Sequence, residues 1–216
     1  MPFSSRVQKA IKAPASQLAS SIEGSILFLR NAQKIQLTVL ASSELTEDHR
    51  KSIWDIFEDN MRALYMTSSF GWDPSSKQTE LFDPLSRFIL LERMNENNQL
   101  EEGAESPIGV ESSTFPRTLV AYTMFRFERE DSQNVIYCYE LQVKRETQRL
   151  GLGKRLTQCL VDVGTEWKMK KVMLTVFKSN EEAHQFYRSI GFSTDPTSPE
   201  FSEEDKCDYI IMSKRI

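Results

Sequence analysis

The chain is poor in the residues that build metal centres, disulfide frameworks and membrane spans. It holds two histidines and three cysteines in 216 residues, and no cysteine pair has the C-x-x-C spacing. These counts argue against a structural zinc site and a disulfide framework. The longest early apolar stretch, residues 25–29, falls far short of the roughly 20 residues that a membrane-spanning helix needs. We therefore expect a soluble protein with no metal ion and no membrane partner, working in a reducing compartment.

An excess of positive charge is lacking too. Lysine and arginine total 27 against 31 acidic residues, which gives a net charge of −4. This balance excludes a surface that grips nucleic acid over its whole extent, so we expect no direct nucleic-acid site and only a local basic patch. The length favours a single domain over residues 25–216, preceded by a flexible basic arm over residues 1–24. Residues 96–116 are predicted to form a mobile acidic loop, because the stretch from 96 to 111 has five acids and no lysine or arginine.

Apolar periodicity and turn signals predict a mixed α/β domain. A helix is expected to follow Thr46 and to end near residues 65–69, and a strand is expected at residues 86–92. Residues 118–127 and 134–143 are predicted to form an antiparallel hairpin, the strongest β signal in the chain. A helix from residue 152, a strand at 171–177, a helix capped by Asn180 and ended by Gly191, and a strand at 207–213 complete the expected order.

A glycine-containing turn precedes the helix expected from residue 152. It reads Gln148-Arg149-Leu150-Gly151-Leu152-Gly153-Lys154. Backbone N–H groups at the start of a helix point outward at the positive end of its dipole, a geometry that binds phosphate. Residues 144–155 carry five basic side chains and one acidic one, which is a basic patch in an acidic chain. The turn lacks the glycine spacing of both the dinucleotide fingerprint and the P-loop, so a different phosphate-bearing ligand is indicated.

A second motif follows at a fixed distance, Asn180-x-x-Ala183-x-x-Phe186-Tyr187-x-x-x-Gly191. Together the two motifs resemble the Gcn5-related N-acetyltransferase (GNAT) superfamily. The resemblance implies an α/β fold with a mixed, mostly antiparallel central sheet whose middle strands splay apart, and acetyl-coenzyme A as the co-substrate. It implies that the coenzyme contacts Leu141, Gln142, Val143, Gln148, Arg149, Leu150, Gly151, Leu152, Gly153, Lys154, Asn180 and Tyr187.

Two strings are more specific: Tyr137-Cys138-Tyr139-Glu140 and Lys170-Lys171-Val172-Met173-Leu174-Thr175-Val176-Phe177-Lys178. They resemble the NatD-type N-α-acetyltransferases, which modify the N-terminal serine of histone four and histone two-A. This resemblance implies histone tails beginning Ser-Gly-Arg as partners and a place in the cytoplasm and nucleus. A ribosomal partner stays open, and a monomer is expected. The residues that it implies for substrate binding are Tyr65, Trp72, Glu128, Arg129, Glu130, Tyr139, Thr175 and Tyr209, with Phe70 as a nearby wall.

An α-amine has a pKa of about 8 and must lose a proton before it attacks a thioester, so a base or a water relay is needed. Glu140 is the first candidate for the base, and a relay through Tyr137, Tyr139 and water is the alternative. Tyr187 is the candidate that protonates the departing thiolate. In a regular strand Tyr139 and Glu140 face opposite sides, so they share a pocket only if a β-bulge re-aims one of them, as the resemblance implies.

Structural interpretations stay open beside these functional ones. The tyrosines at 137 and 139 are also ordinary strand aromatics, Tyr65 also completes an apolar helix stripe, and Glu140 also suits an ion pair with a basic neighbour. The acidic residues between 195 and 208 suit either a solvated loop or recognition of a basic tail. The functional alternatives are a GNAT enzyme for a lysine ε-amine or a small amine, and an inactive module that binds acetyl-coenzyme A or a histone tail.

Overall fold

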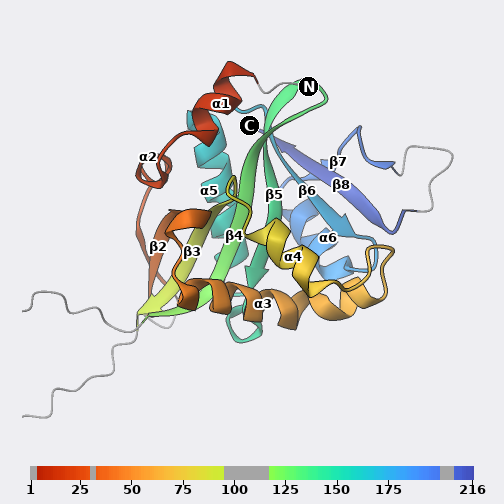
Figure 1. Cartoon of the computed structure of the whole chain (residues 1–216), viewed down its shortest axis with the longest axis horizontal. Helices are drawn as coiled ribbons and strands as arrows, with labels where there is room; N and C mark the ends of the chain where they lie inside the picture. Colours follow the sequence, from red (N-terminus) through yellow and green to blue (C-terminus); the bar gives the residue numbers. More distant parts are fainter. Residues whose placement is uncertain (1–3, 30–32, 95–116, 200–206) are drawn as a thin grey trace, which may run out of the picture.

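The computed structural model describes residues 4–29, 33–94, 117–199 and 207–216. Its strands form one eight-stranded sheet in the order β1-β2-β3-β4-β5-β6-β8-β7, and only β5 and β6 pair in parallel (Figure 1). The strands are β1 (Ile26–Phe28), β2 (Lys34–Ala41), β3 (Arg87–Met94), β4 (Arg117–Glu130), β5 (Gln133–Val143), β6 (Lys171–Phe177), β7 (Ser193–Thr194) and β8 (Tyr209–Arg215). The helices are α1 (Ser5–Ile11), α2 (Ala15–Ala19), α3 (Glu47–Met66), α4 (Pro74–Leu81), α5 (Leu152–Glu166) and α6 (Glu181–Ser189), with 3-10 turns η1 (Ser42–Glu44) and η2 (Arg145–Thr147).

Helices cover both faces of this sheet. Strand β3 shows the division, because Phe88 and Leu90 pack with the cluster under α3 and α4, whereas Ile89 and Leu91 belong to the larger cluster under α1, α2 and α5. This alternation follows from the two-residue period of a strand. All four side chains are fully buried, which explains why β3 reads as a continuous apolar run. In the described part of the chain, none of the helices is long and apolar enough to cross a membrane.

The parallel pair β5 and β6 stays together for only a few residues. Pairing runs from Val135 with Lys171 to Cys138 with Leu174 and stops there. Beyond this point β5 continues along β4 while β6 continues along β8, so the two middle strands diverge, as Figure 1 shows. The mixed, mostly antiparallel sheet with splayed middle strands that the sequence predicts is therefore confirmed.

The β4–β5 pairing is irregular at the point of divergence. Met124 pairs with Glu140 and Phe125 pairs with Cys138, which leaves Tyr139 as the additional residue between them. An extra residue on one strand of an antiparallel pair is a β-bulge, which bends the strand and re-aims its side chains. The extra residue is therefore Tyr139, which together with Glu140 was expected to need such a bulge to share a pocket.

The described N-terminal residues differ from the flexible arm expected over residues 1–24. Helices α1 and α2 pack onto the sheet, and Val7, Ala10 and Leu18 have no exposed surface. These three apolar residues form one buried stripe within a segment rich in serine and lysine. The Arg155 guanidinium on α5 also donates a hydrogen bond to the Gly24 carbonyl at 3.1 Å. Strands β1 and β2 follow this segment, where the sequence suggested that the arm leads into a helix, and they extend the sheet beneath α1 and α2.

The other expected elements lie within a few residues of their predicted places. The helix after Thr46 is α3, with the Thr46 hydroxyl accepting from His49 N–H as its cap. The predicted hairpin is formed by β4 and β5, and the later helices and strands are α5, β6, α6 and β8. Helix α4 occupies a stretch that the sequence left unassigned. The acidic loop predicted at 96–116 lies outside the described residues.

Candidate active site

The divergence of β5 and β6 opens a cavity of about 970 Å³. Its wall comes from α3, α4, the two diverging strands, and the N-terminal ends of α5 and α6. Most of the residues singled out in the sequence line it: Tyr65, Glu128, Glu130, Tyr137, Tyr139, Glu140, Leu141, Gln142, Val143, Gln148, Arg149, Gly151, Leu152, Gly153, Lys154, Thr175, Asn180 and Tyr187. Two regions distant in sequence, the hairpin strand and the α6 motif, thus face one space.

One end of the cavity has the geometry of an anion site. The turn before α5 bends through Arg149 and Gly151, whose φ angles are 63° and 86°, and Gly151 is the N-cap of the helix. An alanine Cβ at Gly153 would lie 3.1 Å from the Phe186 ring, so this glycine allows close packing of α5 against α6. The first amides of α5 have no intrahelical acceptor, and Arg149 and Lys154 line the cavity beside them. These groups fit the phosphates of a coenzyme A.

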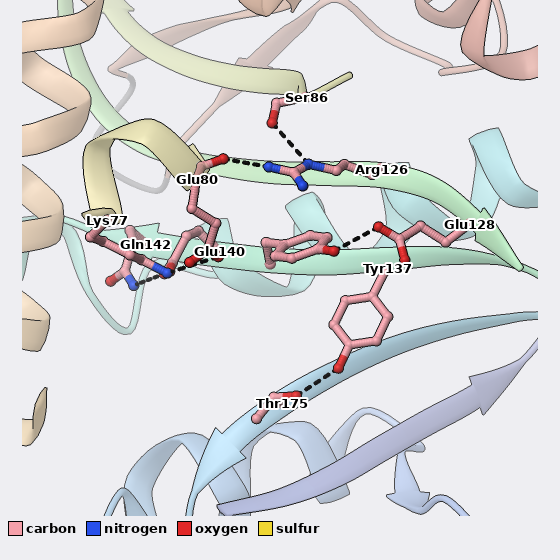
Figure 2. Close-up of polar contacts among 10 residues, drawn as sticks. Lys77, Glu80, Ser86, Arg126, Glu128, Tyr137, Glu140, Gln142 and Thr175 are labelled. Atoms are coloured by element: carbon pink, nitrogen blue, oxygen red, sulfur yellow. Dashed lines mark hydrogen bonds and ion pairs between the residues drawn. The ribbon is translucent and has the colours of Figure 1, made fainter. Parts of the chain in front are cut away.

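The opposite wall carries two hydroxyl contacts (Figure 2). The Tyr139 hydroxyl donates to Glu128 Oε1 at 2.6 Å, and the Tyr137 hydroxyl shares a hydrogen bond of 2.6 Å with Thr175 Oγ1 across the diverging strands. The Arg126 guanidinium lies 4.5 Å from the centre of the Tyr139 ring and donates to Ser86 Oγ at 3.1 Å. Tyr139 is therefore held at its ring and at its hydroxyl.

Glu140 lies deeper and is only 5% exposed. Its Oε1 lies 2.8 Å from the Lys77 ammonium, and its Oε2 accepts a hydrogen bond of 2.8 Å from Gln142 Nε2. Gln142 in turn accepts from Asn60 Nδ2 at 3.0 Å. Both oxygens of the carboxylate are thus held, one by a cation from α4 and one by an amide from its own strand. The bulge at Tyr139 lets Tyr139 and Glu140 line the same cavity, the arrangement that strict alternation forbids.

The tyrosines of the site hold their protons at neutral pH. Burial, followed by the negative charge of Glu140, raises the pKa of Tyr65 to about 12. Burial also raises the pKa of Tyr187, with smaller effects from Cys138 and Glu140, and the pKa values of Tyr137 and Tyr139 move in the same direction for the same main reason. These phenols therefore act as hydrogen-bond donors in the resting protein, and Tyr187 suits the role of a proton donor.

Four of the residues singled out in the sequence do not line the cavity: Leu150, Trp72, Arg129 and Tyr209. Trp72 packs behind the wall, with its ring 6.2 Å from that of Tyr65, and Tyr209 contacts Phe70 with ring centres 5.5 Å apart. Leu150 is exposed at the tip of the turn, and Arg129 lies on β4. Trp72 and Tyr209 thus support side chains that reach the cavity.

Of the acidic stretch at 195–208, residues 200–206 lie outside the described part, and its two ends make contacts. Asp195 is buried and accepts from the Lys171 ammonium at 2.6 Å. Asp208 accepts from the Ser69 hydroxyl at 2.9 Å, which ties the loop after α3 to the start of β8. The two ends of the stretch are therefore held by partners within the folded domain.

Sequence reasoning missed Lys77, Glu80 and Asn60, all of which line the cavity. Lys77 belongs to α4, whose sequence Pro-Ser-Ser-Lys-Gln-Thr-Glu-Leu has no apolar stripe that would predict which side faces inward. Asn60 lies on the long helix α3 among residues of mixed character. The sequence around Lys77 and Asn60 therefore has no local pattern that predicts an inward-facing side chain.

A wedge between splayed strands, an amide-lined anion site at one end and a buried carboxylate at the other define an enzyme that transfers a group from a phosphate-bearing co-substrate. The chain belongs to the acetyltransferase (GNAT) family, whose sequence model matches residues 50–192. Members of this family use acetyl-coenzyme A. In the part of the chain that the structure describes, no cluster of three or more histidine, cysteine or acidic side chains is placed to hold a metal ion.

Solved structures show the same fold at low sequence identity. The chain is similar to the NatC complex bound to Gag peptide and CoA (TM-score 0.53, 12% identity, covering 84% of this chain and 98% of that one). It is also similar to Ard1 from Thermoplasma volcanium (0.51, 15%, 83% and 97%). A third similar structure is the PaiA N-acetyltransferase of Thermoplasma acidophilum in complex with coenzyme A (0.52, 14%, 84% and 99%).

Proposed function

We propose that this protein transfers an acetyl group from acetyl-coenzyme A to the α-amine of an N-terminal serine, on histone tails that begin Ser-Gly-Arg, as in histone four and histone two-A. The observation that carries the proposal is the cavity wall itself. It brings Glu140, the Tyr139–Glu128 contact and the Tyr137–Thr175 contact into the same cavity as the anion site. All of these residues except Glu128 belong to the two strings that resemble NatD-type enzymes.

The chemistry requires a neutral amine close to the thioester that acetyl-coenzyme A supplies. Glu140 is the carboxylate on the cavity wall that accepts the amine proton, directly or through a water molecule. The amine nitrogen then forms a bond to the acetyl carbon while the carbon–sulfur bond breaks. Tyr187, protonated and on the α6 side of the cavity, gives its proton to the sulfur. The excess proton on the new amide nitrogen returns to Tyr187 through water, and Glu140 releases the first proton to solvent before the next turnover.

The charge of the wall supports a basic peptide as the acceptor. Glu128 and Glu130 both line the cavity, on the same side of β4 because they are two residues apart. The pKa of Glu130 is raised, chiefly by burial and then by the charge of Glu128. A nearby arginine of the tail relieves this repulsion between like charges, so binding a cationic peptide is favourable here.

The setting of the reaction follows from the substrate. With histone tails as substrates, we propose that the enzyme acts in the cytoplasm and in the nucleus. Whether it also contacts the ribosome stays open. We propose that the enzyme acts as a monomer without direct nucleic-acid contact.

The test is to incubate the protein with acetyl-coenzyme A and a Ser-Gly-Arg-Gly-Lys peptide, either free or blocked at its N-terminus. Tandem mass spectrometry then locates the added acetyl group. Acetyl on the α-amine of the free peptide alone supports the proposal, whereas acetyl on lysine in both peptides assigns the protein to ε-amines. Coenzyme binding without product on either peptide points to a small amine or to a non-catalytic binding module.

The Glu140→Gln variant tests the base in the same assay. Its expected effect is a loss of kcat of about 100-fold or more, the scale of general base catalysis, with the coenzyme Kd unchanged. An unaltered kcat removes Glu140 from the proton transfer and leaves a tyrosine and water relay.

A further inference from the structure

Lys77 is an uncommon feature of the cavity wall, because it is a lysine with only 8% of its surface exposed. Lysine is almost never buried unless its charge is paired. Helix α4 begins at an Asp73 cap, whose carboxylate accepts from Ser76 N–H at 3.0 Å, with Pro74 in the first turn. This well-capped short helix directs only Lys77 and Leu81 into the protein.

The Lys77 ammonium is surrounded by two carboxylates and two aromatic rings. It lies 2.8 Å from Glu140 Oε1 and 3.2 Å from Glu80 Oε1. It also lies 5.2 Å from the centre of the Phe57 ring and 5.4 Å from that of Tyr65, within the range of cation–π attraction. Figure 2 shows Lys77, Glu140 and Gln142 side by side, with the carboxylate between an ammonium and an amide.

Lys77 does not act as a base itself. Burial alone lowers its pKa, but the nearby negative charges, first that of Glu140 and then that of Glu80, outweigh burial and raise it above its usual value. The residue is therefore a fixed positive charge at every pH at which the enzyme works.

The other titratable groups around Glu140 are neutral. They are Tyr65 on α3, Tyr122 on β4, Cys138 on β5 and Tyr187 on α6, each of which has a pKa raised mainly by burial. Glu80, on the same helix as Lys77, adds a negative charge. Among the described residues that face Glu140, Lys77 supplies the positive charge that compensates the carboxylate.

We propose that Lys77 is a positioning residue for acetyl transfer, whose ammonium fixes the orientation of the Glu140 carboxylate on the cavity wall, where it meets the incoming amine. The inference rests on the proposed function of Glu140 but not on the identity of the amine. Without Lys77, one oxygen of the buried carboxylate loses its partner and the group is free to rotate, which misplaces the acceptor for the amine proton.

A double-mutant cycle isolates this action. Lys77→Met, Glu140→Gln and the double variant are compared with the wild type for kcat, for amine KM and for coenzyme Kd. The comparison uses whichever amine the wild-type protein acetylates, so that a wrong peptide assignment does not affect it. Lys77→Met is expected to lower kcat by about tenfold to 100-fold, the cost of a misplaced group, with the coenzyme Kd unchanged. In the Glu140→Gln background the same change is expected to alter kcat by less than about twofold, because coupled residues are not additive.

Two further variants separate positioning from stability. Lys77→Arg keeps the charge and is expected to recover kcat at least partly, with the amine KM and the coenzyme Kd unchanged. Lys171→Met removes the buried lysine of another ion pair, with Asp195 at 2.6 Å, and is the matched control for lost stability. If Lys77→Met alone folds poorly, Lys77→Arg keeps the buried charge paired and takes its place in the cycle, with Lys77→Arg/Glu140→Gln as the matching double variant.

The proposal fails if Lys77→Met lowers kcat by the same factor with and without Glu140. It also fails if Lys77→Arg is no better than Lys77→Met in folded protein, or if Lys171→Met produces the same loss of kcat. Absence of acetylation of the Ser-Gly-Arg peptide by the wild type contradicts the proposed function instead and leaves the cycle to be run on the amine that is accepted.

Discussion

Replacing Gly151 by alanine tests the anion site at the start of α5. Gly151 has a φ of 86° and open space where a Cβ would go, so the substitution brings backbone strain without a clash. A left-handed conformation costs an L-residue about 1 to 2 kcal/mol, while the stiffer unfolded chain returns about 0.4 to 1 kcal/mol. If the turn relaxes to relieve the strain, its amides move away from the phosphate positions and coenzyme binding weakens. A loss of about 1.4 kcal/mol of binding free energy corresponds to a tenfold rise in the coenzyme Kd.

Calorimetric titration with coenzyme A measures this Kd, and denaturant unfolding measures the stability. Gly71→Ala is the matched control, since Gly71 has a φ of 69° and equally open space but lies in the loop between α3 and α4. Both variants are expected to lose similar stability, and only Gly151→Ala is expected to bind coenzyme A more weakly. Equal affinities for the two variants would refute the assignment of the phosphate site to this turn.

Three more predictions concern side chains. Tyr139→Phe removes the hydroxyl that donates to Glu128 at 2.6 Å but keeps the ring that contacts the Arg126 guanidinium. The peptide KM should rise about tenfold, which is the scale of one hydrogen bond to a charged group. An unchanged KM in steady-state kinetics would contradict this role. Burial of Asp195 is outweighed by the hydrogen bond from Lys171, so the pKa of Asp195 is lowered in the folded protein. The stabilising contribution of ionised Asp195 is therefore complete above its unfolded pKa of about 3.9 and is lost as the pH falls below that value. Lys171→Met should lower the free energy of unfolding at neutral pH by about 3 to 5 kcal/mol. In denaturant unfolding measured over a series of pH values, the variant should also lose less stability on acidification than the wild type. Burial raises the pKa of the Cys138 thiol to about 12, so iodoacetamide at pH 8 should leave Cys138 unmodified in native protein and alkylate it after unfolding, as peptide mass spectrometry would show.

The elements that were predicted correctly are those whose conformation is set by a local pattern of residues in the element itself. The hairpin of β4 and β5, the glycine turn before α5 and the Asn180 cap of α6 each carry a local pattern, and the structure has all three. The N-terminal helices were missed because their polarity resembles that of a disordered arm. Only the fit of Val7 and Leu18 against the sheet decides that the segment folds, and a tertiary contact of this kind has no local signal.

The same limit applies to the site. Tyr137, Tyr139 and Glu140 were found from a string of adjacent residues, and the bulge that aims them was expected from resemblance and not from the pattern of the strand. Lys77 lies 63 positions before Glu140, on a helix whose sequence is polar on every side. Its burial depends on the register of α4 over the sheet, which a single sequence does not reveal.

The short parallel pairing of β5 and β6 links the stability of the sheet to the binding of a ligand between these strands. Beyond Cys138 and Leu174 the two strands diverge without pairing, and a coenzyme held by the residues that line this gap would bridge them. A ligand that binds only the folded state stabilises it by an amount that grows with the logarithm of the ligand concentration. The free energy of unfolding of this protein is therefore expected to rise with the concentration of acetyl-coenzyme A.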